Sequence, residues 1–151
     1  MGYNTLSAST TASNNTAIGH KVLEASTSGA QLTGLGGFAL TNNTTGADNT
    51  ALGYGTLSSN TTGGQNTAVG RHALNQNTTE SYITAVGYYA LKDNTTGTKG
   101  TAVGSGSLQQ NTTGNYNTAL GQSALYTNTT ASNCTGLGYR ALYLSLIHIW
   151  R

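Results

Sequence analysis

Apolar residues recur along this chain with a period of seventeen residues, and the polar residues between them recur in the same register. We number each unit from its Asn-Thr-Ala phrase, so that Asn49 is position 1 and Gln65 is position 17. Up to about Tyr143, position 4 is apolar, position 5 is glycine and position 9 is leucine in every unit. A fixed internal period predicts a solenoid or array in which each unit buries its apolar side chains only against its neighbours.

The first positions of each unit predict a short β-strand. Side chains alternate along an extended segment, which puts Thr50 and Leu52 on one face and Ala51 on the other. We therefore expect the aliphatic residue at position 4 and the leucine at position 9, here Leu57, to form a narrow core. The small residues at position 3 would then line the opposite face and allow another chain to approach closely.

The rest of the unit predicts turns. Residues 53–60 fit a second strand, an irregular turn or a single helical turn, and a strand or irregular turn is favoured. The Asn-Thr-Thr-Gly segment at 60–63 predicts the corner that returns the chain to the next coil, because Asn and Gly tolerate positive φ and Thr hydroxyls bond nearby backbone groups.

These patterns predict an all-β fold, a parallel β-solenoid (β-roll) of about nine 17-residue coils over residues 1–143. The chain has no proline, which suits a stack of hydrogen-bonded strands. Sequence rich in Asn, Thr and Gly is also typical of disordered segments, but the strict placement of leucine favours an ordered structure. The pattern is open at both ends, so we interpret residues 1–143 as an uncapped fragment of a longer solenoid.

Residues 144–151 break the pattern, and two interpretations of them are open. One is a capping strand. The other, which we favour, is that the segment Leu-Ser-Leu-Ile-His-Ile-Trp-Arg is the translation of a sequencing adapter, since its coding sequence resembles a transposase mosaic end. We therefore exclude this tail from functional reasoning.

The low charge of the chain excludes several classes of function. Only 7% of the 151 residues are charged, and the net charge of +2 is spread thinly. The lysines and arginines are not clustered into a stripe along which phosphates could bind, so nucleic acid is not an expected partner. No stretch is apolar enough to predict a membrane-spanning segment or a signal peptide, so we expect no membrane insertion within this fragment.

No residues are predicted to be catalytic, cofactor-binding or metal-binding, and we expect the protein not to be an enzyme. His20 and His72 occupy different unit positions and have no acid in phase with them, which favours surface roles. Four acids are too few for the Asp-rich turns of a calcium-binding roll. The lone Cys134 replaces Asn at position 1, where a buried or edge thiol is favoured over a nucleophile or zinc ligand.

Two further motifs have simple structural interpretations. Residues 34–39 match the dinucleotide fingerprint Gly-x-Gly-x-x-Ala, but the alternating strand and long helix that such a site needs are not predicted. The asparagines at position 12 are formal glycosylation acceptors, and turn chemistry is the favoured interpretation. These are Asn43, Asn60, Asn77, Asn94, Asn111 and Asn128.

A homo-oligomer, with a trimer favoured, is expected from the small core. Two apolar residues per coil bury little surface compared with the conformational entropy lost when seventeen residues are ordered. Burial of a further face against other copies of the chain would offset part of that loss.

The phrase Asn-Thr-Ala-aliphatic-Gly-x-x-Ala, seen at 66–73 and 117–124, resembles the head repeats of YadA-like trimeric autotransporter adhesins. It is also similar to repeat regions of bacteriophage tail fibres. The resemblance covers residues 1–143 and implies a left-handed parallel β-roll in a homotrimer, displayed outside the cell on a bacterial surface or on a virion. The chain departs from those adhesin repeats in its longer period and in having threonine where they carry valine.

The expected function is therefore that of a structural and adhesive rod that attaches to a host surface. The nine tyrosines offer amphipathic area for a glycan or protein receptor, or for packing between subunits. An ice-binding solenoid that uses threonine arrays is the alternative. Adjacent pairs such as Thr61-Thr62 point to opposite sides of an extended segment, which disfavours a flat array at the corners.

Overall fold

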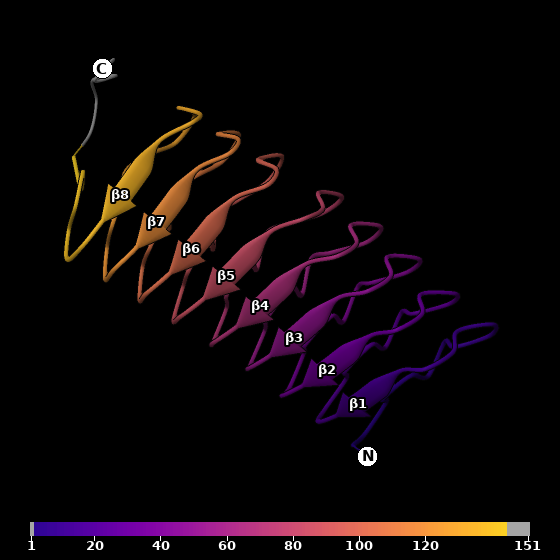
Figure 1. The fold of residues 1–151 in the computed structure, drawn as a ribbon. Coiled ribbons are helices and arrows are strands. Elements are labelled where there is room, and N and C mark those ends of the chain that lie inside the picture. The colour runs from indigo at the N-terminus through magenta and orange to yellow at the C-terminus, as the bar shows by residue number, and fades with distance from the viewer. Residues whose placement is uncertain (1, 145–151) are drawn as a thin grey trace.

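A computed structural model describes residues 2–144, and they form a stack of parallel strands (Figure 1). The predicted capping strand or adapter segment lies outside these residues, apart from Leu144. Each strand pairs in parallel with the next, which gives one eight-stranded sheet in chain order. The strands are β1 (Thr16–Ile18), β2 (Thr33–Leu35), β3 (Thr50–Leu52), β4 (Thr67–Val69), β5 (Thr84–Val86), β6 (Thr101–Val103), β7 (Thr118–Leu120) and β8 (Thr135–Leu137). The predicted parallel β-solenoid is confirmed.

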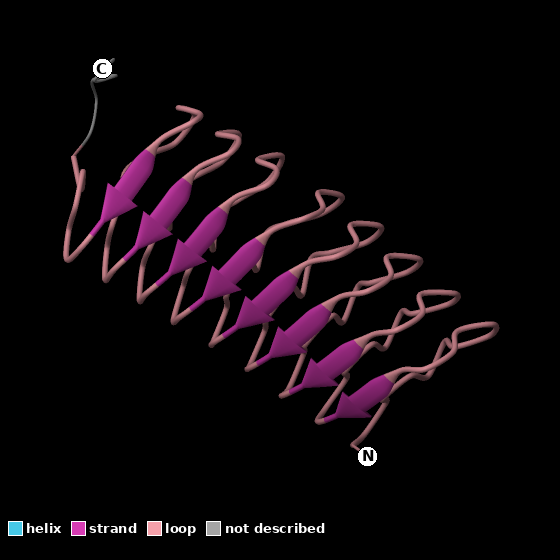
Figure 2. Cartoon of the chain, in the orientation of Figure 1, coloured by secondary structure: helices cyan, strands magenta, loops and turns pink. Residues whose placement is uncertain are grey.

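The strands repeat with a strict offset of seventeen residues. Between β3 and β4, for example, Thr50 lies beside Thr67 and Leu52 lies beside Val69. Turns and bends form the rest of each coil, so strands occur on one side of the stack only (Figure 2). About nine coils were expected, and the described residues contain eight strands, because the N-terminal partial unit enters the pattern at position 4, after most of its strand.

The predicted composition of the core is wrong at two positions. Ala51, at position 3, is fully buried and contacts the core together with Leu57, at position 9. Position 4 instead points outward: Ile18 is 52% exposed, and the other aliphatic residues of this row are half-buried or exposed. The alternation of side chains along the strand is as expected, but its phase is the opposite of the predicted one.

The narrow interior of the coil explains this phase. A leucine from the turn segment of every coil already fills the space behind the sheet, which leaves room for a methyl group but not for a second large side chain. Variation in side-chain size at position 8 is matched by variation at position 3 of the next strand. Val22 stands at position 8, where most units have a smaller residue, and a Cβ at Gly34 of the next strand would lie 2.5 Å from the Val22 Cγ1 atom. This packing explains the glycine at the start of the dinucleotide-like motif.

Residues 53–60 form an irregular turn, as favoured from the sequence. The turn depends on backbone conformations with positive φ. Gly53 has a φ of 134°, and Leu57 has a φ of 51° although it is not glycine. Leucine in this left-handed region costs roughly 1–2 kcal/mol, and complete burial of its side chain offsets that cost.

A ladder of buried asparagine side chains runs through the corners at position 12. The Asn60 Nδ2 atom donates to the Asn43 Oδ1 atom at 2.7 Å and to the Gly63 carbonyl at 2.9 Å. The Asn60 Oδ1 atom in turn accepts from the Asn77 Nδ2 atom at 2.9 Å. All six of these asparagines are at most 3% exposed, so their amides stabilise the corners and are not presented for glycosylation.

A second ladder at the corners is made by threonine hydroxyls at position 13. The Thr44 Oγ1 atom donates to the Thr61 carbonyl, and the Thr61 Oγ1 atom donates to the Thr78 carbonyl, each at 3.0 Å. The described strand threonines at position 2 make no such hydroxyl bonds from coil to coil. Within residues 2–144 the hydroxyl ladder lies at the corners instead, because those hydroxyls face the carbonyl groups of the next coil.

The stack is looser at one corner. Glu80 occupies position 15, where the preceding unit has Gly63, and a Cβ at Gly63 would lie only 2.4 Å from the next backbone. The Asn94–Asn77 bond beside Glu80 is correspondingly long, at 3.4 Å. In Figure 1 the corner before β6 stands further from the corner before β5 than neighbouring corners do. The side chain of Glu80 therefore separates these two coils locally.

Ser26 interrupts the asparagine ladder at its N-terminal end. Ser26 stands at position 12, and among residues 2–144 its Oγ atom is the one buried side-chain polar atom without a hydrogen-bond partner. An asparagine here would place its Oδ1 atom where the Asn43 Nδ2 atom can donate to it, and its own Nδ2 atom near the Gly29 carbonyl.

We expect Ser26→Asn to raise the free energy of unfolding by about 1–2 kcal/mol, since each buried hydrogen bond contributes roughly 1 kcal/mol. Chemical denaturation followed by circular dichroism measures this change. Ser26→Ala, which removes the unpaired hydroxyl without extending the ladder, should give a smaller gain. Equal stability of the two variants would contradict the role of the ladder.

Candidate binding surfaces

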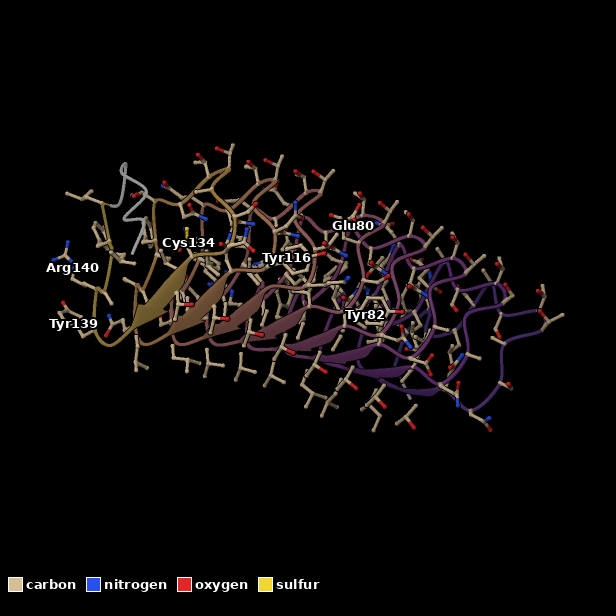
Figure 3. All side chains as sticks on the ribbon, turned by 45° about the horizontal axis from the view of Figure 1, so that its top comes forward. Glu80, Tyr82, Tyr116, Cys134, Tyr139 and Arg140 are labelled. Carbon is tan, nitrogen blue, oxygen red and sulfur yellow. The ribbon has the colours of Figure 1, made fainter. Side chains whose placement is uncertain are left out.

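The first candidate surface is the outer face of the sheet, which we define as the side chains at positions 2 and 4 of the eight strands. Figure 3 shows side chains that project away from the strands along this side of the stack. Parallel in-register pairing makes two continuous rows. One row is Thr16, Thr33, Thr50, Thr67, Thr84, Thr101, Thr118 and Thr135, and the other is Ile18, Leu35, Leu52, Val69, Val86, Val103, Leu120 and Leu137.

The outer face is apolar in one row, hydroxylic in the other, and carries no charged side chain. The exposure of its aliphatic residues ranges up to 75% at Leu137, at the C-terminal end of the sheet. Contiguous apolar rows of this length on a protein surface mark sites of association.

The second candidate surface is an aromatic ladder formed by residues at positions 6 and 7. Its rings contact one another from coil to coil with centroid separations of 5.0–5.7 Å. Most of the contacts are edge-to-face, a preferred geometry of aromatic pairs. The ladder consists of Tyr3, His20, Phe38, Tyr54, His72 and Tyr89, with Tyr88 stacked on Tyr89.

The aromatic ladder covers only part of the rod. The next two coils have Ser105-Gly106 and Gln122-Ser123 at the same positions, and therefore lack rings. Tyr139 and Arg140 lie at the C-terminal end of the stack (Figure 3), where the Arg140 guanidinium carbon lies 4.2 Å from the Tyr143 ring centroid. The outer face, in contrast, continues through all eight strands.

A shallow hollow of about 310 Å³ lies beside the middle rings of the aromatic ladder. Glycines make space for this arrangement. A Cβ at Gly37 would lie 3.4 Å from the Tyr54 ring, and a Cβ at Gly55 would lie 2.6 Å from the His72 ring. The hollow is lined by Phe38, Tyr54 and His72 together with Thr41, Asn42, Gly55 and Ser58.

The cations around the hollow are engaged with other groups. The Lys21 Nζ atom lies 3.3 Å from a Glu24 carboxylate oxygen, and the Lys92 Nζ atom lies 3.0 Å from an Asp93 carboxylate oxygen. Arg71 lies 5.9 Å from the centroid of the Tyr88 ring. The lining of the hollow itself is uncharged when His72 is neutral.

The environment of His72 favours its neutral form. Burial lowers the pKa of His72 below its ordinary value of 6.5, and the nearby charges of Arg71 and Lys92 lower it further. The Nδ1 atom lies 3.3 Å from the Asn75 Nδ2 atom, which can only donate. The two hydrogens of the Asn75 amide have nearer acceptors in the Gly55 carbonyl, at 2.8 Å, and the Ser58 Oγ atom, at 2.7 Å.

The lowered pKa of His72 predicts a loss of stability in acid. The unfolded chain binds the proton more tightly than the folded chain, so the contribution of neutral His72 is complete above the unfolded pKa of 6.5 and is lost as the pH falls through the folded pKa. We expect His72→Gln to remove this part of the pH dependence, measured by denaturation at a series of pH values below 7. If the free energy of unfolding of His72→Gln changed with pH as that of the parent chain does, the loss of stability in acid would belong to another group.

The structure brings together residues that appeared unrelated in the sequence. His20 and His72 both belong to the aromatic ladder, where Phe38 and Tyr54 connect them. Because the ring stands at position 6 in some coils and at position 7 in others, neither position alone showed a consistent aromatic pattern. The rings of successive coils nevertheless contact one another. Reading positions 6 and 7 together in the sequence would have predicted these contacts.

The remaining candidates of the sequence analysis stay apart. No three His, Cys, Asp or Glu side chains within residues 2–144 are grouped so that they could hold a metal ion. Cys134 is a partly buried free thiol in the last strand-bearing coil, and its amide donates to the Asn117 Oδ1 atom at 2.8 Å.

Comparison with protein-family models, curated proteins and solved structures found no match for this chain. No helix among the described residues is long and apolar enough to cross a membrane. The two surfaces therefore provide the physical basis for a functional proposal.

Proposed function

We propose that this chain is a non-enzymatic structural and adhesive rod that attaches to a host surface. It belongs to the head of a bacterial surface adhesin or to a phage tail fibre, and therefore acts outside the cell. It assembles as a homotrimer through the outer face of its sheet. The resemblance of its repeats to YadA-like heads and tail-fibre repeats supports this assignment, together with the solenoid fold.

The observation that carries the proposal is the unbroken aliphatic row of the outer face. Eight aliphatic side chains lie in register along it. The row is on the order of 34 Å long, given seven strand spacings of about 4.8 Å. Leaving such a row in water is unfavourable, because burial of apolar area contributes about 25 cal/mol per Å².

A second copy of the same chain is the partner that best fits this face. Its own outer face has the same spacing from coil to coil, so every aliphatic side chain of one copy meets an equivalent row on the next. The absence of charged side chains from both rows means that no like charges are brought together. Three copies around one axis would bury all three outer faces, as the resemblance implies. The interface is thus assigned to positions 2 and 4, not to the small residues at position 3.

The oligomeric state tests this proposal. We expect light scattering on the purified chain to give three times the chain mass of 15.4 kDa. Val86→Lys places a charge in the centre of the outer face and should lower the mass to that of a monomer. Thr62→Lys, at an exposed corner, is the matched control and should remain a trimer. A monomeric parent chain with a folded circular dichroism spectrum would refute the proposed assembly.

Ice binding is the alternative function. The threonine row of the outer face suits it better than the threonine pairs at the corners. The row is in register on a sheet face, whereas the corner hydroxyls are already bonded to carbonyl groups. An ice-binding face must be free in solution. Thermal hysteresis by a monomeric chain, lost in Thr84→Lys, would support this alternative over the trimeric rod.

A further inference from the structure

We infer that the hollow in the aromatic ladder binds one pyranose unit of an uncharged glycan. This inference rests on the proposed attachment function and assigns a ligand class to it. The hollow is a local feature of the rod, lined by Phe38, Tyr54 and His72 on its aromatic side. Rings that served only to pack subunits together would be expected in every coil, as the aliphatic residues of the outer face are.

The aromatic side of the hollow suits the apolar face of a sugar ring. Aromatic faces carry partial negative charge and attract the polarised C–H groups of a pyranose. The Phe38 and Tyr54 rings lie 5.5 Å apart, and the Tyr54 and His72 rings lie 5.6 Å apart, so the three rings brace one another. Tyr54 is still 50% exposed and available for contact. Because the rings are held in place before binding, little conformational entropy is lost on contact.

The polar side of the hollow offers donors and acceptors that suit sugar hydroxyl groups. The Ser58 Oγ atom accepts from the Asn75 Nδ2 atom at 2.7 Å, so its own proton is free to donate. The Asn42 Nδ2 atom donates to the Ser58 carbonyl at 2.8 Å, which leaves the Asn42 Oδ1 atom as an acceptor. The neutral His72 ring adds a nitrogen that can bond to a hydroxyl group in either tautomer.

The size and charge of the hollow further narrow the ligand class. A volume of about 310 Å³ is at the small end of ligand sites, which are roughly 300–1,000 Å³. Its lining contains no lysine, arginine or carboxylate, so nothing there would select an acidic sugar or a charged peptide. A uniform apolar groove would suit a proline-rich peptide, but this hollow has hydroxyl and amide groups beside its rings.

Saturation-transfer NMR on the full chain tests this inference. The probes are D-glucose, D-galactose and N-acetyl-D-glucosamine, each as the free sugar and as its β-linked disaccharide. We expect transfer to the C–H protons of at least one sugar, together with a shift of the Gly55 amide signal. Tyr54→Ala should weaken that binding at least about 10-fold, and Asn42→Ala should weaken it less.

Tyr82→Ala is the matched control, because Tyr82 is 59% exposed and stands at position 17, outside the ladder. It should bind the sugar as the parent chain does. Circular dichroism of each variant checks that it is folded. The inference is overturned if no sugar binds, if folded Tyr54→Ala binds as well as the parent, or if a proline decamer shifts the Gly55 amide while the sugars do not.

The oligomer measurement separates this inference from the proposed assembly. A trimer that binds none of the sugars would refute the glycan site and leave the rod intact. A folded monomer that binds sugar through Tyr54 would refute the trimer and leave the glycan site intact.

Discussion

Gly70→Ala is expected to lower the free energy of unfolding by about 3–5 kcal/mol, the largest effect of any single substitution considered for this chain. Gly70 has a φ of 122°, a conformation that side chains rarely adopt. A Cβ at this position would also lie 2.5 Å from the carbonyl oxygen of Gly87 in the next coil. That oxygen belongs to the backbone and cannot rotate away, so the two coils would have to separate.

Thermal and chemical denaturation followed by circular dichroism would measure this loss. Gly100→Ala is the matched control, because a Cβ there would meet the Leu91 Cδ1 atom at 3.6 Å, an ordinary contact. The control should change stability by less than about 1 kcal/mol. Similar losses in the two variants would show that close approach of the coils at position 5 is not what requires glycine.

Asn60→Ala is expected to have the second-largest effect, a loss of about 2–4 kcal/mol. The substitution removes the donor to the Asn43 Oδ1 atom and to the Gly63 carbonyl, and the acceptor of the Asn77 amide. These partners are buried, and each buried polar group left unpaired costs roughly 1–3 kcal/mol. The loss also separates Asn43 from the rest of the ladder, whose neighbouring bonds support one another.

The same denaturation measurements test the asparagine ladder. Asn42→Ala is the control, since Asn42 is the preceding coil's exposed asparagine and donates to the Ser58 carbonyl at the surface. Its loss should be below about 1 kcal/mol. If both variants were equally stable, the buried amides would contribute no more to the corners than a surface hydrogen bond does.

The fold class could be predicted because the period is visible in every unit. Glycine at position 5 and leucine at position 9 recur without an insertion, and stacking of identical coils is the one arrangement that places each of them in the same environment. The structure confirms that arrangement with a register of seventeen residues at all seven strand pairings.

The phase of the strand could not be predicted in the same way. Hydrophobicity favours Leu52 over Ala51 for the interior, and this preference led to the wrong assignment of the core. The space behind the strand is already taken by Leu57 of the same coil, so the smaller residue faces inward. Such a limit on volume arises between segments, and the order of residues along one strand does not contain it.

The candidate sites were predicted less well than the fold. The aromatic ladder joins residues at two different unit positions, and its rings meet only because consecutive coils stack closely. The corner asparagines were correctly assigned to turns, but their burial follows from the packing of one corner on the next.

By itself, the sequence determined the period, the parallel stacking of coils and the positions that need glycine, since these depend on local backbone geometry repeated along the chain. Only the tertiary structure decided which side of the strand faces water, which asparagines are buried and which aromatic rings touch. Those properties depend on the distance and volume between coils, and that spacing exists only once the coils have stacked.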